Sequence, residues 1–138
     1  MILLDTNVLS EGTKPKPSES VLRWLDAQDA LSIFTTSISQ AEILYGIERL
    51  PAGKRRSRLS AAATKTFAED FDGRILPFDR DAAAWYAKVV AERESAGRPI
   101  SQFDAMIAAI ARSHKATLAT RNTADFEGCG IQLINPWS

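Results

Sequence analysis

The first seven residues, Met-Ile-Leu-Leu-Asp-Thr-Asn, constrain the fold more than any other part of the chain. Residues 2–4 form an unbroken apolar run, which is typical of a short strand buried on both faces of a sheet. The run ends at Asp5, and the two polar residues after it favour turns and helix N-caps. Open α/β sheets form their ligand crevice at the carboxyl ends of such strands. We therefore predict that Asp5 is the first ligand of a divalent-cation site.

Beyond this strand, short apolar segments alternate with segments whose apolar residues recur at helical spacing. Further strands are expected at residues 31–35, 74–78, 117–120 and 132–134. Helices are expected at about residues 6–12, 19–27, 39–50, 54–70, 79–96, 101–115 and 122–126. This alternation predicts an α/β fold with a central parallel sheet of four to five strands, right-handed crossovers and helices on both faces.

The length and composition predict one globular domain. The 138 residues contain no repeat or linker, so we expect a single domain over residues 1–138. Lys plus Arg equals Asp plus Glu at 17 each, so net charge gives no argument for a nucleic-acid partner. The lone cysteine, Cys129, excludes an internal disulfide and a cysteine-rich zinc site. Since there is no membrane-length apolar run or signal-peptide pattern, we expect a cytoplasmic protein without a membrane partner.

Acidic and amide side chains recur at junctions that lead into an expected helix, and all of them except Asp104 follow an expected strand. They are Asp5, Glu42, Asp104, Asn122 and Asp125. Because the carboxyl ends of parallel strands lie along one edge of a sheet, we expect these side chains to meet there. Oxygen ligands of this kind suit Mg²⁺ or Mn²⁺, and such a site can support an in-line displacement at phosphorus.

Each of these residues also has a purely structural explanation. Residues 39–42 (Ser-Gln-Ala-Glu) match a capping box, residues 101–104 and 122–125 resemble one, and Asp5 can cap the first helix. The metal-site hypothesis therefore depends on the whole set. Helix capping does not require the acids to follow strands that a doubly wound sheet brings together. Gathered carboxylates also repel one another unless a cation offsets their charge.

Four motifs, in this order, resemble those of PIN-domain proteins, and above all the VapC and FitB toxins of bacterial toxin–antitoxin pairs. They are Asp-Thr-Asn at 5–7, Ala-Glu-Ile-Leu-Tyr-Gly at 41–46, Phe-Asp-Ala-Met-Ile-Ala-Ala at 103–109 and Ala-Thr-Arg-Asn-Thr-Ala-Asp-Phe at 119–126. The resemblance covers the whole chain, including Asn-Pro-Trp at 135–137. It implies a single PIN-like domain and an endoribonuclease toxin that uses Mg²⁺, with Mn²⁺ able to substitute. It also implies inhibition by a VapB- or FitA-like antitoxin, and a homodimer that assembles further with it.

The resemblance also implies roles for individual residues. Asp5, Glu42 and Asp104 match three acidic positions of the family. At the fourth position many relatives carry Asp where this chain has Asn122, and others use the acid three residues on, here Asp125. As hypotheses, Asp5 and Asp104 are the principal ligands, and Glu42 and Asp125 hold metal-bound waters or a second ion for attack on RNA by an activated water. Candidate positioning groups for ligands or substrate are their polar neighbours: Thr6, Asn7, Thr120 and Arg121.

Further features of the sequence bear on alternative functions. The basic run Lys-Arg-Arg-Ser-Arg at 54–58 suits either an RNA backbone or a solvated helix face. The only histidine, His114, follows Asp104 by ten residues on one expected helix, roughly 15 Å away, which argues against a histidine base. Asn122 keeps open a catalytically silent PIN domain that only binds partners. A receiver- or phosphatase-like α/β domain is the other alternative, although no second aspartate follows Asp5 by two residues.

Overall fold

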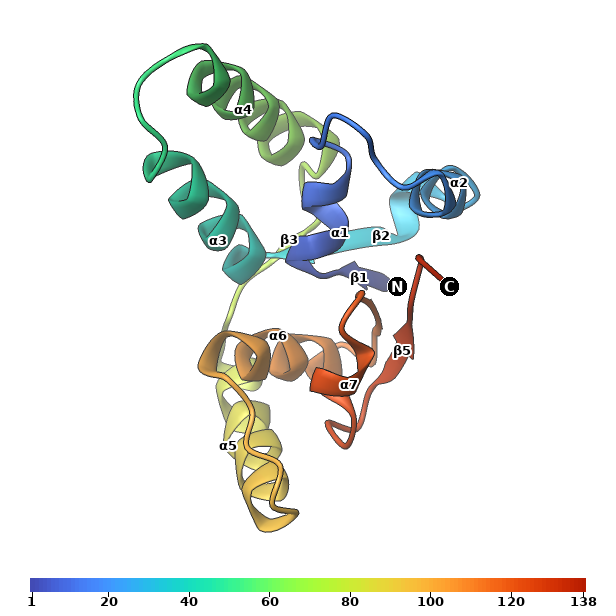
Figure 1. Cartoon of the computed structure of the whole chain (residues 1–138). Coiled ribbons are helices and arrows are strands. Elements are labelled where there is room, and N and C mark those ends of the chain that lie inside the picture. Colours follow the sequence, from blue (N-terminus) through green and yellow to red (C-terminus); the bar gives the residue numbers. More distant parts are fainter.

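The computed structural model describes all residues from 1 to 138, and five parallel strands form its centre (Figure 1). The strand order is β3-β2-β1-β4-β5, so β1 lies in the middle. The bounds are β1 Ile2–Leu4, β2 Ile33–Thr36, β3 Ile75–Leu76, β4 Thr117–Ala119 and β5 Gln132–Ile134. The predicted α/β class with a parallel sheet is confirmed.

Helices cover both faces of the sheet, as predicted. They are α1 Thr6–Glu11, α2 Glu19–Asp26, α3 Ser37–Glu48, α4 Lys54–Lys65, α5 Arg80–Ser95, α6 Gln102–Ser113 and α7 Thr123–Phe126. A 3₁₀ turn, η1 Ala30–Ser32, precedes β2, and a π-helical turn, η2 Thr66–Asp70, follows α4. In Figure 1, α1 to α4 lie on one side of the sheet and α5 to α7 on the other. None of these helices combines the length and apolar character that crossing a membrane requires.

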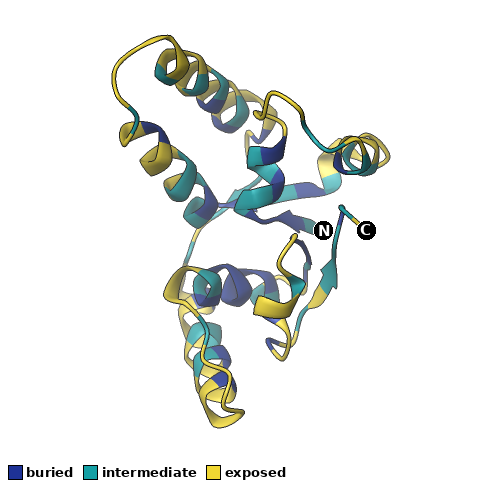
Figure 2. Ribbon diagram, in the orientation of Figure 1, coloured by how far each residue is buried: buried dark blue, intermediate teal, exposed yellow.

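The apolar run of β1 is explained by the two cores that it joins. Leu3 packs in one core with Ile107 and Leu118, whereas Leu4 packs in the other with Val8. Successive side chains of a strand point to opposite faces, so a strand covered on both sides needs apolar residues in succession. Both leucines are buried, and each such burial stabilises the fold by roughly 1.5–3 kcal/mol. Buried residues gather in the central sheet and along α6, as Figure 2 shows. This central strand carries Asp5 to the carboxyl edge of the sheet.

Several sequence expectations about local structure are wrong. Leu31 does not begin the second strand: the Asp29 side chain accepts a hydrogen bond from the Leu31 N–H, which places Leu31 in η1 with 76% of its surface exposed. Phe103, expected to face inward on α6, is 53% exposed. The helix expected to begin at Ser39 starts at Ser37, because Thr36 is its N-cap. Residue propensity and apolar periodicity alone did not predict these observed local structures.

Candidate metal centre

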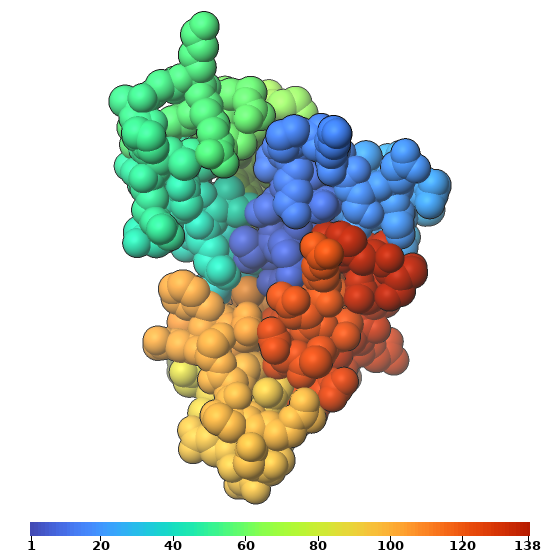
Figure 3. Space-filling model, viewed as in Figure 1, coloured from blue at the N-terminus to red at the C-terminus, as the bar shows by residue number.

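Three of the predicted acids, Asp5, Glu42 and Asp104, line one cleft at the carboxyl edge of the sheet. The cleft encloses about 430 Å³, and none of the residues that line it is hydrophobic. The other lining residues are Thr6, Asn7, Ser10, Lys14 and Asn122. The acids come from the end of β1, from α3 and from the first turn of α6. Figure 3 shows these distant parts of the sequence meeting on one face of the molecule.

Asp5 is the most buried of the three acids, with 6% of its surface exposed. Its Oδ1 accepts a hydrogen bond of 2.8 Å from the Thr6 N–H, and its Oδ2 accepts one of 2.7 Å from the Thr120 hydroxyl. Asp5 is therefore also the N-cap of α1, so the capping interpretation holds alongside the convergence. Burial raises the pKa of Asp5, although both hydrogen bonds favour the charged form.

Glu42 is connected to the same strand end through Thr6. The Thr6 hydroxyl donates to Glu42 Oε1 over 3.1 Å and lies 2.9 Å from Ser39 Oγ. The predicted capping box at residues 39–42 is wrong, because the Ser39 N–H is bound by Thr36 Oγ1 one turn earlier. Glu42 therefore does not take part in capping α3. Burial raises its pKa, and the neighbouring charges of Asp5 and Asp104 add to the effect.

Asp104 lies at the start of α6, where Ser101 is the N-cap. Ser101 Oγ accepts a hydrogen bond of 3.3 Å from the Asp104 N–H, as the capping pattern predicted. The Asp104 carboxylate is half-buried, and this burial raises its pKa, with further contributions from the charges of Asp5 and Asp125. Three acids that each resist ionisation therefore share one polar cleft.

The fourth position divides between two residues. Asn122 is exposed and lines the cleft; its N–H donates to Thr120 Oγ1 over 3.1 Å, and its side chain does not cap α7. Asp125 is exposed and does not line the cleft, but its charge raises the pKa of both Asp5 and Asp104. Asn122 thus lies inside the cleft, whereas Asp125 acts on it electrostatically from the margin.

The other predicted positioning residues differ in their contacts. Asn7 Nδ2 lies 3.5 Å from Asp5 Oδ2 and 3.4 Å from Thr120 Oγ1, and Asn7 Oδ1 accepts from the Arg121 N–H over 3.3 Å. Asn7 therefore connects the start of α1 to the segment after β4. The Arg121 guanidinium lies 5.2 Å from the centre of the Trp137 ring, and Arg121 does not line the cleft. A role for the Arg121 side chain in holding phosphate stays a prediction.

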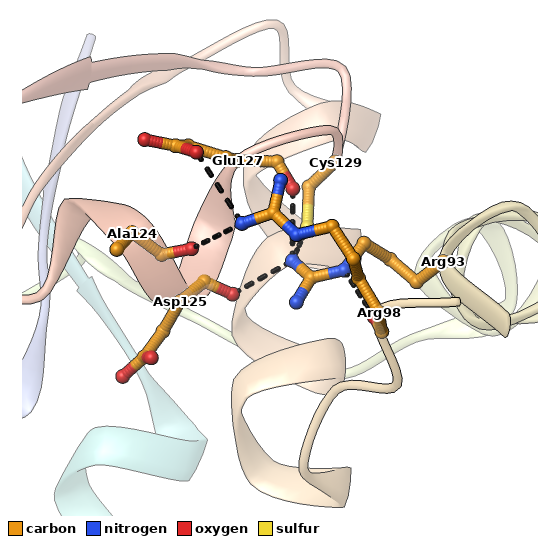
Figure 4. A network of polar contacts seen from close by, with 6 residues as sticks. All are labelled: Arg93, Arg98, Ala124, Asp125, Glu127 and Cys129. Atoms are coloured by element: carbon orange, nitrogen blue, oxygen red, sulfur yellow. Dashed lines mark hydrogen bonds and ion pairs between the residues drawn. The ribbon is translucent and has the colours of Figure 1, made fainter. Parts of the chain in front are cut away.

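Arg93 was missed by the sequence analysis, because an arginine within a helix gives no sign that it is buried. It is 6% exposed, and its Nη1 donates to the backbone carbonyls of Asp125 (2.8 Å) and Glu127 (2.9 Å), as Figure 4 shows. Its Nε donates to the Arg98 carbonyl over 2.6 Å, and Nη1 lies 3.5 Å from Cys129 Sγ. Arg93 therefore joins the end of α5 to the α7 segment. Cys129 is fully buried in the adjoining core, as expected for a packing residue.

The donor set fits a hard divalent cation. It consists of carboxylate, hydroxyl and amide oxygens, which Mg²⁺ and Mn²⁺ prefer. No three acidic, histidine or cysteine side chains converge tightly enough to form a ready-made metal cage. The charge of Asp5 nevertheless raises the pKa of both Glu42 and Asp104, and the charge of Asp104 raises the pKa of Glu42, as expected for carboxylates that share one cleft. A bound cation would offset both the cost of burying the three charges and the repulsion between them.

Comparison with known proteins identifies the family. The PIN domain model matches residues 2–128. The chain is 42% identical to the VapC ribonuclease Y4jK of Sinorhizobium fredii, across 99% of this chain and 98% of that protein. It is 39% identical to the toxin FitB of Neisseria gonorrhoeae, across 99% of both chains. It is 32% identical to the tRNA(fMet)-specific endonuclease VapC of Shigella flexneri, across 99% of this chain and 97% of that one.

Solved structures agree with this. A structure of FitAB bound to an IR36 DNA fragment superposes with a TM-score of 0.95 at 39% identity, covering 100% of this chain and 96% of the other. VapBC2 from Rickettsia felis, bound to a DNA fragment from its promoter, gives a TM-score of 0.77 at 26% identity and 98% coverage of both chains. The fold, the full-length similarity and the matched family model together show that this chain belongs to the PIN-domain family, with VapC ribonucleases and the FitB toxin among its relatives.

Proposed function

We propose that this protein is a divalent-cation-dependent endoribonuclease and the toxin of a toxin–antitoxin pair. The observation that carries the proposal is the gathering of Asp5, Glu42 and Asp104 in a cleft without hydrophobic lining. A fold alone does not establish an activity, because one fold hosts many functions. The support therefore comes from this site together with relatives that are named ribonucleases and endonucleases.

Asp5 and Asp104 would be the principal ligands of Mg²⁺ or Mn²⁺, with Glu42 beside them and Asn122 or Asp125 completing the set. When bound, the cation supplies charge stabilisation at phosphorus and makes water more acidic. The protein's part is to hold the carboxylates still. Thr120 binds one oxygen of Asp5, and Thr6 binds Glu42 through its side chain and Asp5 through its N–H. Such contacts fix the orientation of metal-binding side chains.

Attack by water on phosphorus also needs a group that accepts a proton from the water. The raised pKa of Glu42, caused first by burial and then by the charges of Asp5 and Asp104, brings its basicity closer to that suited to a general base near neutral pH. Its Oε1 accepts from Thr6, and the residue also lines the cleft. We assign Glu42 the role of orienting the attacking water and accepting its proton.

We propose that an antitoxin segment occupies a second cavity next to the acidic cleft. This cavity of about 320 Å³ lies between α1, α3 and α4, and half of the residues that line it are hydrophobic, among them Leu9, Ile43, Ile47, Leu59 and Phe67. It shares Thr6, Ser10 and Glu42 with the acidic cleft. A peptide in the groove would therefore reach the acids, and a cationic side chain on it would compete with the metal. Related toxins have been solved in complexes named FitAB and VapBC2.

RNA cleavage tests the proposal. We expect the protein, freed of any antitoxin, to cleave labelled total RNA in Mn²⁺ or Mg²⁺ and to be inactive in EDTA. Transfer RNA is the substrate to try first, since one relative is named for cleavage of tRNA(fMet). RNA that stays intact in both metals would overturn the enzyme proposal and favour a silent, partner-binding PIN domain.

The assembly and site of action remain predictions of the same account. A toxin that cleaves cellular RNA would act in the cytoplasm, and its one cysteine is free and buried. Homodimer formation, implied by the family resemblance, is tested by light scattering of the isolated protein. The antitoxin is tested by co-expression with the adjacent small reading frame, which should suppress both toxicity and RNA cleavage.

A further inference from the structure

The end of α1 carries an unusual buried carboxylate. Glu11 is 4% exposed, and its Oε2 accepts no well-aligned hydrogen bond, although one ammonium group lies within ion-pair distance of it. It is the last residue of α1, where a negative charge is unfavourable against the helix dipole. Buried charges are costly unless they are paired. Local packing of α1 therefore does not by itself explain why an acid stands at this position.

The partner of Glu11 is a lysine that lines the acidic cleft. Lys14 Nζ lies 3.2 Å from Glu11 Oε2, and the Lys14 N–H donates to the Glu11 carbonyl over 3.2 Å. Thr13 stabilises the turn after α1, because its N–H and its hydroxyl both donate to the Ser10 carbonyl. Lys14 is thus held to Glu11 at both its backbone and its ammonium group. Its side chain is still 51% exposed, so the ammonium remains accessible.

Lys14 is the only cation among the eight residues that line this cleft. The cleft otherwise presents Asp5, Glu42 and Asp104, which repel a phosphodiester as well as one another. A lysine ammonium has three donors, and the contact with Glu11 leaves others free to bind phosphate. Lys14 therefore places a positive charge at the acidic cleft, where it can attract a polyanion. Glu11, which holds Lys14, is buried and does not line the cleft.

We propose that Lys14 binds the phosphate backbone of the RNA at the entrance to the acidic cleft, and that Glu11 is a positioning residue for Lys14. The inference rests on the proposed ribonuclease function and deepens it. The contact is to a phosphate and not to a base, so it contributes affinity without sequence preference. It acts on substrate binding and leaves the chemical step unchanged.

Single-turnover cleavage of labelled tRNA in Mn²⁺ tests Lys14 with a matched control. Lys14→Gln removes the charge, and Lys14→Arg keeps it. Lys16→Gln is the control, because Lys16 is an exposed lysine in the same loop that does not line the cleft and its loss changes the net charge equally. Thermal melting of each variant verifies folding.

For Lys14→Gln we expect the half-saturating enzyme concentration to rise about three- to tenfold, the loss expected for one solvent-exposed hydrogen bond, with little change in the maximal rate. The slope of log affinity against log salt should fall by about 0.7, the value for one phosphate contact on a single strand. Lys14→Arg should restore most of the affinity. Lys16→Gln should match the wild type.

Glu11 is tested by a double-mutant cycle. Glu11→Gln keeps the shape and removes the charge, and we expect it to weaken RNA binding in the wild type but to have no further effect on RNA binding in the Lys14→Gln background. A purely structural Glu11 would lower RNA binding, melting temperature or both to the same extent in the two backgrounds, which would overturn its positioning role.

The inference on Lys14 is overturned if Lys14→Gln and Lys16→Gln bind RNA with the same affinity and salt slope, or if Lys14→Gln lowers only the maximal rate. In either case the proposed function stands, provided that wild-type cleavage depends on metal and on Asp5. If the wild type does not cleave RNA in Mn²⁺, the proposed function fails and this inference fails with it.

Discussion

The two sides of the acidic cleft are held in different ways. On the β1 side, hydroxyl groups of Thr120 and Thr6 bind the carboxylate oxygens of Asp5 and Glu42 directly. On the α7 side, Arg93 binds backbone carbonyls and leaves the Asp125 carboxylate free. The first arrangement fixes the orientation of side chains, whereas the second fixes only the path of the chain. We infer that the β1 side supplies the rigid ligands and the α7 side supplies charge that can adapt.

Replacing an acid tests this difference most strongly. Asp5→Asn or Asp104→Asn should lower the cleavage rate on the order of a thousandfold, about 4 kcal/mol, because each removes a principal ligand. Asp125→Asn should cost less than about tenfold, since that carboxylate does not line the cleft. Single-turnover rates in Mn²⁺ measure both. Equal losses for Asp5 and Asp125 would end the distinction between the two sides.

Loss of Arg93 should affect stability more than the choice of ligands. Arg93→Met removes a buried guanidinium that donates to the carbonyls of Arg98, Asp125 and Glu127, and we expect a loss of roughly 3 kcal/mol in the free energy of unfolding. Urea denaturation measures it. The matched control is Arg98→Met, whose side chain is exposed and should cost well under about 1 kcal/mol. An Arg93 variant as stable as the wild type would contradict the inference that Arg93 holds the α7 segment.

The hydroxyl support of Asp5 predicts an effect on metal affinity. Thr120→Val keeps the shape of a fully buried side chain but removes the hydrogen bond of 2.7 Å to Asp5. We expect Mn²⁺ to bind about 10- to 100-fold more weakly, as when other supporting contacts of metal ligands are removed. Thr120→Ser should retain most of the affinity. Calorimetric titration of the two variants decides whether the hydroxyl or only the packing matters.

The raised pKa values of the acids predict how stability depends on pH. Burial raises the pKa of Asp104 in the folded protein above its usual 3.8, so the folded state holds this proton more tightly than the unfolded state. As pH falls from the folded pKa towards 3.8, protonation of Asp104 therefore stabilises the folded state. Above the folded pKa, the cost of burying the ionised Asp104 carboxylate is fully present. Without metal, Asp104→Asn should be more stable than the wild type at neutral pH, and the gain should vanish in acid. A gain that is independent of pH would exclude the desolvation explanation.

The smallest effect concerns the fourth position. Asn122→Asp adds a carboxylate to a cleft that already holds three, so Mn²⁺ should bind a few-fold more tightly at low salt. The same variant should be slightly less stable without metal, because the new charge repels the others. Titration with Mn²⁺ and thermal melting in EDTA give the two readings. Weaker binding in Asn122→Asp would show that Asn122 does not face the ion.

Sequence reasoning predicted the parts of the molecule that local pattern determines. The run at residues 2–4 predicted β1 with its bounds, and Asp5 followed at the expected edge. The first residue of α3 was predicted wrongly. Thr36 and Ser39 are both favourable N-cap residues by type, and only the position at which β2 ends selects Thr36. Arg93 and Glu11 were missed for a different reason. Their burial depends on segments that are remote in sequence or on the turn that follows, and no period in the chain reveals it.

The central claim is that carboxylates from distant parts of the chain bind one divalent cation at the edge of the sheet. Anomalous diffraction from crystals soaked in Mn²⁺ tests it most directly. We expect a manganese peak in the cleft, coordinated by oxygens of Asp5 and Asp104. A map without a peak in this cleft, with the two side chains pointing apart, would contradict it.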